Sequence, residues 1–115
     1  DSSKKYFSGT ITYEDVVCHK PHPEAYLKAI DYSNLPVQNC LAIEDSPNGV
    51  ESAKAANLSC LMTPTEWFKR DNIKLRTANA CVDSLGSLLN PSNLIYGIPI
   101  NSKIVDFNYL SSLIN

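Results

Sequence analysis

The stretch Cys40-Leu-Ala-Ile-Glu-Asp-Ser-Pro-Asn-Gly49 joins a short apolar run to two adjacent acidic residues and a turn. Its first four residues are apolar, which predicts a short buried strand. That strand delivers Glu44 and Asp45 at its carboxyl end. In open parallel sheets flanked by helices, ligands bind in the crevice outside the carboxyl ends of the strands. The two carboxylates are therefore expected at a ligand-binding edge of an α/β fold.

A helix is predicted directly after the acidic pair. Ser46 is a preferred N-cap residue, and Pro47 suits the first helical position. The helix is expected to reach about residue 57, and the residues at helical spacing on its apolar face are Val50, Ala53 and Ala56. One interpretation of the acidic pair is purely structural, because carboxylates stabilise a helix N-terminus.

The second interpretation of the acidic pair is a metal site. Two carboxylates held side by side repel each other unless a cation or a proton lies between them. Carboxylate oxygens are hard ligands of the kind that Mg²⁺ binds. Glu44 and Asp45 are therefore candidate Mg²⁺ ligands.

A second motif, His19-Lys20-Pro21-His22-Pro23, lies upstream of the acidic pair. Two prolines so close together exclude regular structure up to Pro23, which suits the first turn of a helix predicted over residues 23–32. Lys20 is therefore expected on a rigid loop before a helix. Taken alone, such a lysine is usually a solvated surface group. Beside an acidic pair at a strand end, it becomes a candidate for stabilising the charge of a phosphoryl group.

The two motifs together resemble a known family. Lys-Pro-x-Pro-x-x-Tyr (residues 20–26) and Ile-Glu-Asp-Ser-x-x-Gly-x-x-x-Ala-x-x-Ala (residues 43–56) resemble the third and fourth motifs of haloacid dehalogenase-like hydrolases. The CbbY and β-phosphoglucomutase-like subgroup is the most similar, and the resemblance extends over about residues 12–88. It implies an α/β fold, namely the C-terminal part of a Rossmann-like core whose parallel sheet is flanked by helices.

The resemblance also implies how the chain is divided. Residues 1–90 are expected to form the C-terminal portion of the core, and residues 91–115 a tail that packs on it. The family's sheet has the strand order 5-4-1-2-3, and this chain is expected to supply the third, fourth and fifth strands and a later one. The first two strands and the cap are expected to be absent. The fourth strand should then have an unpaired edge, and the chain should need the missing N-terminal half of the core.

The family's catalysis, as the resemblance implies, uses an aspartate nucleophile in an Asp-x-Asp motif and forms an aspartyl-phosphate. The chain contains no Asp-x-Asp, because its aspartates stand at positions 1, 15, 31, 45, 71, 83 and 106. The chain also begins at Asp1 rather than at methionine, which fits a piece of a longer product. The nucleophile is therefore expected outside this chain.

The resemblance assigns roles to residues that are present. Lys20 is expected to pair with the nucleophile and the phosphoryl oxygens, and Glu44 and Asp45 to hold a Mg²⁺ cofactor. Ser46 and Asn48 are expected to support the site through metal-bound water or backbone groups. We predict a Mg²⁺-dependent phosphatase that acts on a small sugar phosphate. A phosphomutase of the same fold and a non-catalytic fragment that binds phosphate or another chain are the alternatives.

Further elements are predicted from local patterns. Apolar, aromatic and β-branched runs predict strands over residues 6–13, 59–63 and 80–82. Capping residues and helical spacing predict a helical turn over residues 64–68, a short helix over residues 84–89 and a terminal helix from about residue 104. Phe107, Leu110 and Leu113 are expected to form the apolar face of the terminal helix.

Composition excludes several classes of protein. With 115 residues, 43 % of them hydrophobic, one modest core is expected. The net charge is −2 and the basic residues are scattered, so no nucleic-acid partner is expected. No apolar run approaches the roughly 20 residues that a membrane span needs. The four cysteines form no Cys-x-x-Cys motif, and the resemblance points to a reducing, cytoplasmic location in which they stay unpaired.

Overall fold

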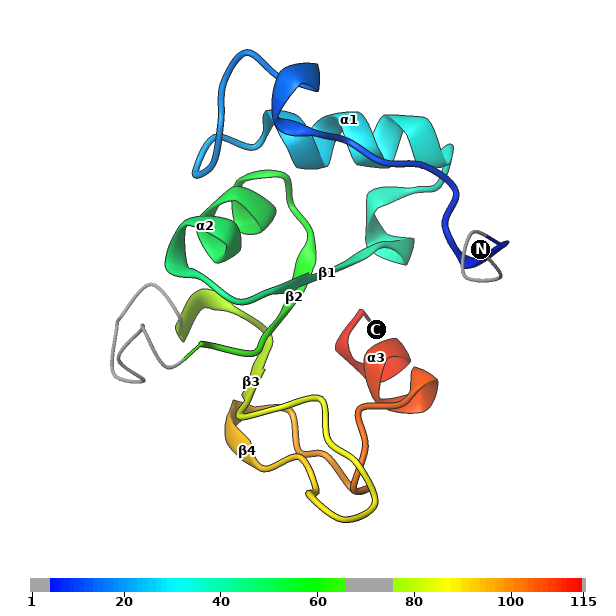
Figure 1. Cartoon of the computed structure of the whole chain (residues 1–115), viewed down its shortest axis with the longest axis vertical. Helices are drawn as coiled ribbons and strands as arrows, with labels where there is room; N and C mark the ends of the chain where they lie inside the picture. The colour runs from blue at the N-terminus through cyan, green and yellow to red at the C-terminus, as the bar shows by residue number, and fades with distance from the viewer. Residues whose placement is uncertain (1–4, 66–75, 115) are drawn as a thin grey trace.

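A computed structural model describes residues 5–65 and 76–114 of the chain (Figure 1). The helices are α1 (Glu24–Ser33), α2 (Pro47–Ala55) and α3 (Phe107–Leu113), together with the short 3₁₀ helices η2 (Tyr13–Asp15) and η3 (Val37–Asn39). The strands are β1 (Leu41–Glu44), β2 (Ser59–Met62), β3 (Ala80–Val82) and β4 (Leu94–Gly97).

The strands form one sheet in the order β1-β2-β3-β4. β1, β2 and β3 are parallel, and β4 runs antiparallel to β3. This is the helix-flanked α/β arrangement that the sequence predicts. In the part of the chain that the structure describes, β1 pairs with β2 alone, so its other edge is open. The unpaired edge expected for this strand is therefore present.

Alternation along the strands divides the core into two layers. Ala42, Cys60, Met62 and Cys81 face α2, where they pack with its buried residues. Leu61, Ala80 and Val82 face the opposite side, where they pack against Tyr109 and Leu113 of α3. Figure 1 shows α2 and α3 on the two sides of the sheet, with α1 above α2 in the view. The sheet is therefore covered on both faces by elements of this chain.

Several elements agree with the sequence predictions. β1, β2 and β3 lie where apolar runs predict strands, and α1 and α2 lie where helices are predicted. The predicted apolar face of α2 is confirmed, because Val50, Ala53 and Ala56 are all buried. α3 is also present, but its N-cap is Asp106, whose carboxylate accepts a hydrogen bond from the amide of Tyr109 at 2.8 Å. Its first residue, Phe107, is 81 % exposed, so Tyr109 and Leu113 provide its main packing.

Two predictions of local structure are wrong. Residues 6–13 form no strand. The segment ends instead in a capping box, in which the side chain of Asp15 accepts hydrogen bonds from the amide and the hydroxyl of Thr12, and η2 begins at Tyr13. Residues 84–89 form no helix, because Gly86 has a φ of +85° and the carbonyl oxygen of Leu85 accepts a hydrogen bond from the distant amide of Val105 at 2.8 Å.

The strand β4 lies in a segment that was not predicted as regular structure. It pairs with β3 through an irregular register, in which Ala80 faces Gly97 and Val82 faces Leu94. The predicted turn over residues 64–68 lies mostly outside the described residues, and its first two residues are not helical. No helix among the described residues combines the length and the apolar character needed to cross a membrane.

Candidate functional site

The turn between β1 and α2 is built by its own sequence. Ser46 is the N-cap of α2, and its hydroxyl accepts a hydrogen bond from the amide of Gly49 at 3.1 Å. Pro47 occupies the first helical position, where a missing N–H costs nothing. The predicted cap is confirmed. This turn fixes the carboxyl end of β1 against the first turn of α2.

Glu44 is the last residue of β1 and is 7 % exposed. It shares the strand face of Ala42, so its side chain enters the layer between the sheet and α2. There it lies against Gly49 so closely that a Cβ on that glycine would be 1.8 Å from Glu44 Oε2. Gly49 is therefore required by the position of this carboxylate. Burial of an ionised carboxylate requires partners, and the structure provides two.

The first partner of Glu44 is Lys20. Its ammonium nitrogen lies 2.5 Å from Glu44 Oε1, and its side chain is 42 % exposed. The sequence predicts that these two motifs act together, and the structure places their charged groups in direct contact. The Lys20 side chain is therefore paired with Glu44 while part of it remains exposed to solvent.

The loop that carries Lys20 is fixed to its surroundings on both sides. The peptide bond between Lys20 and Pro21 is cis. The buried hydroxyl of Ser52, on α2, donates a hydrogen bond to the carbonyl oxygen of His22 at 2.8 Å. On the other side, Glu24 Oε2 accepts the amide of Val17 at 2.6 Å. The loop is therefore held by α1 and α2 together.

The second partner of Glu44 is Tyr26, on the first turns of α1. Its hydroxyl donates a hydrogen bond to Glu44 Oε1, the same oxygen that contacts Lys20. Its ring centroid lies 5.1 Å from the ammonium of Lys20. Burial raises the pKa of Tyr26 above its usual value, and the hydrogen bond to Glu44 raises it further. The sequence gives Tyr26 only as a residue of a helix face and of the family motif, and no spacing rule identifies its hydroxyl as a partner of Glu44.

Asp45 follows Glu44 directly but has different surroundings. It is exposed, and no hydrogen bond or ion pair involves its carboxylate within the described part of the chain. Asn48 is also exposed, whereas Ser46 is half-buried and engaged as the cap. The structure therefore gives the two adjacent carboxylates opposite environments, one buried and paired, the other open at the end of the strand.

The donor set fits Mg²⁺ in part. Asp45 offers a free carboxylate, and Mg²⁺ is commonly bound by one or two carboxylates together with waters and substrate phosphates. Over residues 5–65 and 76–114, no cluster of three His, Cys, Asp or Glu side chains is arranged to hold a metal ion. Any remaining ligands would have to be water, substrate or groups from outside this set.

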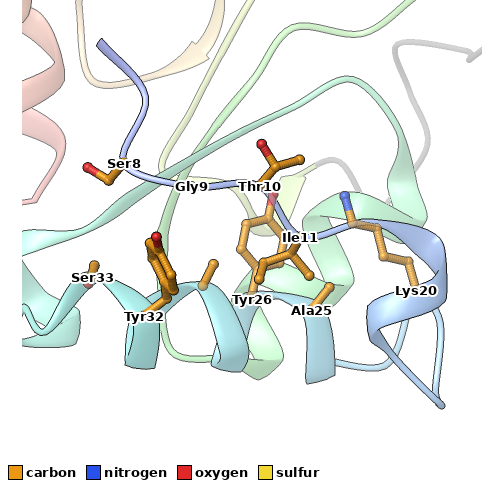
Figure 2. Close-up of a pocket in the computed structure, with 10 residues that line it drawn as sticks. Ser8, Gly9, Thr10, Ile11, Lys20, Ala25, Tyr26, Tyr32 and Ser33 are labelled. Carbon is orange, nitrogen blue, oxygen red and sulfur yellow. The ribbon is translucent and has the colours of Figure 1, made fainter. Parts of the chain in front are cut away.

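A pocket of about 390 Å³ adjoins Lys20 and Tyr26. It lies between α1 and the segment of residues 8–11, which crosses the face of that helix (Figure 2). Lys20 and Tyr26 line one end of the pocket, and Tyr32 and Ser33 line the other. The Lys20 and Tyr26 side chains are therefore accessible from this side of α1.

Comparison with known proteins agrees with this arrangement. The family described as "Hydrolase: haloacid dehalogenase-like hydrolase" matches residues 3–57, which include both motifs. The CbbY protein of Rhodobacter capsulatus is 42 % identical over 59 residues, which are 51 % of this chain and 26 % of that protein. Hexitol phosphatase B of Escherichia coli O157:H7 is 30 % identical over 82 residues, 71 % of this chain and 36 % of that protein.

A solved structure is similar in fold as well as in sequence. It is a crystal structure of CbbY from Rhodobacter sphaeroides in complex with xylulose-(1,5)-bisphosphate, and it matches with a TM-score of 0.58 and 32 % identity. The match covers 66 % of this chain and 34 % of the CbbY chain. The chain thus spans about a fifth to a third of the length of the relatives that it matches. The resemblance to the haloacid dehalogenase-like hydrolases, and within them to the CbbY-like group, is therefore confirmed over part of the chain.

Proposed function

We propose that this chain carries the metal-binding and lysine-containing part of a Mg²⁺-dependent phosphatase that acts on a small sugar phosphate. The observation that carries the proposal is the contact of 2.5 Å between Lys20 and the buried Glu44, beside the open carboxylate of Asp45. An ammonium and a free carboxylate at the carboxyl end of a strand are suited to bind a phosphate and the cation that accompanies it.

Lys20 has three N–H groups, one of which is directed at Glu44. Among the described residues no other acceptor contacts the ammonium, so its remaining N–H groups are available to a phosphoryl oxygen and to an attacking carboxylate. Such donors stabilise the negative charge on the transferring group, and they do so without reorganisation when they are already positioned. Glu44 supplies that positioning, because its carboxylate is buried and its own position is fixed.

Mg²⁺ bound at Asp45 would reduce the repulsion between an anionic nucleophile and the phosphate. We assign the direct ligand role to Asp45 and propose that Glu44 supports the site through Lys20. This changes the sequence prediction, in which both carboxylates hold the metal, because Glu44 Oε1 already accepts two hydrogen bonds and Oε2 lies against Gly49. Asn48 and Ser46 are proposed to act through metal-bound water or the backbone.

The nucleophile of this proposal is an aspartate outside the chain, which contains no Asp-x-Asp. It would form an aspartyl-phosphate that water then hydrolyses. The open edge of β1 supports this division, because a further parallel strand paired there would end beside Asp45. The missing N-terminal half of the core is thus proposed as a required partner of this chain.

The relatives support the choice of substrate class. One relative is hexitol phosphatase B, and the CbbY structures contain xylulose-(1,5)-bisphosphate or phosphate. Residues 91–115 are proposed as a tail on the core, which is supported by the pairing of β4 with β3 and by the packing of α3 on the sheet. A cytoplasmic location is part of the same proposal and is supported by the resemblance to the CbbY-like group.

The proposal is tested in the full-length product that carries this chain, with p-nitrophenyl phosphate and Mg²⁺. Lys20→Ala and Asp45→Asn are each expected to lower kcat by about 10²–10⁴-fold, because each removes a group that stabilises transition-state charge. Asp31→Asn and Lys5→Ala are matched controls, since both residues are exposed and lie away from Glu44, and they should keep wild-type turnover.

Two results would contradict the proposal. The first is wild-type turnover in Lys20→Ala or in Asp45→Asn. The second is turnover by the 115-residue chain alone, because the nucleophile would then lie within it. With EDTA added, the full-length product should lose activity and regain it on addition of Mg²⁺.

A further inference from the structure

We propose that Tyr26 is a positioning residue that holds Lys20 in place by contacting both the lysine and its partner Glu44. The inference rests on the function proposed above, since it concerns the group that would bind the phosphoryl oxygens. It assigns a role to the Tyr26 hydroxyl, for which the sequence motifs predict none.

Tyr26 contacts the pair from a single rigid element. Its hydroxyl donates to Glu44 Oε1, and its ring lies under the Lys20 ammonium, 5.1 Å from centroid to nitrogen. The residue lies on α1, and it packs against the core layer that contains α2. Lys20, by contrast, lies on a loop and has a long side chain with several rotatable bonds. Tyr26 thus connects the flexible member of the pair to the packed part of the fold.

Lys20 and Tyr26 both donate to the same oxygen of Glu44, and the second donor adds to the positioning of the carboxylate. Oε1 of Glu44 accepts Lys20 and Tyr26 together, and the other carboxylate oxygen lies against Gly49. A carboxylate held by the lysine alone could rotate with it, whereas a second donor from α1 fixes the plane of the carboxylate. The ammonium is then directed by a fixed acceptor and by the face of an aromatic ring, to which a cation is attracted.

The structure also keeps the tyrosine in its donor form. Burial and the hydrogen bond to Glu44 raise the pKa of Tyr26, which favours the protonated hydroxyl that donates to Glu44. Tyr32 provides a comparison on the same helix. It lines the same pocket but is 60 % exposed, and no contact joins it to Lys20 or Glu44. Of these two tyrosines, Tyr26 is therefore the one that contacts Lys20 and Glu44.

The test compares Tyr26→Phe with Tyr32→Phe in the full-length product. Tyr26→Phe keeps the ring and removes the hydroxyl, and we expect kcat to fall about tenfold with KM changed less than twofold, as for the loss of one hydrogen bond to a charged group. Tyr32→Phe should leave both constants at their wild-type values. Tyr26→Leu, which also removes the ring, should lower kcat further.

A second measurement does not depend on activity. Ammonium-selective ¹H–¹⁵N NMR reports the order of the Lys20 side chain, which should fall in Tyr26→Phe and remain unchanged in Tyr32→Phe. An unchanged order of the Lys20 ammonium in Tyr26→Phe overturns the positioning role, whatever the kinetics show. Wild-type turnover in Lys20→Ala would instead overturn the proposed function, and the NMR comparison would still decide whether Tyr26 holds the lysine.

Discussion

Replacement of Gly49 by alanine tests the packing around Glu44 directly. A Cβ at this position would lie 1.8 Å from Glu44 Oε2 and 2.2 Å from Cδ, which is much closer than atoms can approach. The glycine lies in α2, whose backbone is fixed by its hydrogen bonds and by the Ser46 cap, so the carboxylate must move. Its displacement would break the contacts of Oε1 with Lys20 and Tyr26.

The size of the effect follows from two opposing contributions. Within a helix, alanine is more favourable than glycine by about 0.5–1 kcal/mol. Breaking a buried ion pair costs about 3–5 kcal/mol, but the Lys20 side chain is 42 % exposed and water would replace part of the interaction, so we take roughly half of that cost. The net expectation for Gly49→Ala is a decrease of about 0.5–2 kcal/mol in the free energy of unfolding.

The assay is urea unfolding of the full-length product, with turnover measured on the same samples. Ala55→Gly is the matched control, because Ala55 is an exposed residue of the same helix and does not contact Glu44. It should lower the free energy of unfolding by about 0.5–1 kcal/mol and leave turnover unchanged. A Gly49→Ala variant that gains stability by the helix-propensity amount and keeps wild-type turnover would show that Glu44 does not require a glycine here.

Two further predictions concern neighbouring residues. Ser46→Ala should lower the free energy of unfolding by about 1 kcal/mol through loss of the α2 cap, while Ser46→Asp should restore most of it; equal stability of all three in urea would contradict the capping role. Burial, with a smaller contribution from the charge of Glu44, raises the pKa of the Cys60 thiol from 9.0 to about 12. Its contribution to stability is therefore complete below pH 9 and is lost as the pH rises toward 12, because the unfolded chain releases the proton first. Cys60→Ala should make the decrease of unfolding free energy between these pH values shallower, and an unchanged slope would exclude the thiol as its cause.

The elements that the sequence predicted correctly have local signals. β1, β2 and β3 are short apolar runs between polar residues, and α2 has a cap, a proline at its first position and a regular apolar face. The elements that were missed depend on distant partners. β4 exists because residues 94–97 pair with β3, and the loop at Gly86 is held by a hydrogen bond from the amide of Val105 to the carbonyl oxygen of Leu85. No pattern within either segment reports those contacts.

The candidate site shows the same division between local and distant information. Both motifs are visible in the sequence, and their joint action was predicted from chemistry. The different environments of Glu44 and Asp45 follow from the alternation of side chains along a strand. The motif alone predicts both carboxylates as ligands of one metal site. The role of Tyr26 could not be predicted, because its hydroxyl meets Glu44 only when α1 and β1 are packed together.

The open edge of β1 joins the fold to the proposed chemistry. Ile43 of β1 is 45 % exposed, and no strand among the described residues pairs with the open edge of β1. Burying an apolar side chain of this kind and pairing the free backbone groups would both stabilise an added strand. If that strand is parallel to β1, its carboxyl end lies beside Asp45 and within the region that the exposed part of Lys20 can reach. A nucleophilic aspartate at that strand end would therefore meet the metal ligand and the lysine through the same pairing that completes the sheet.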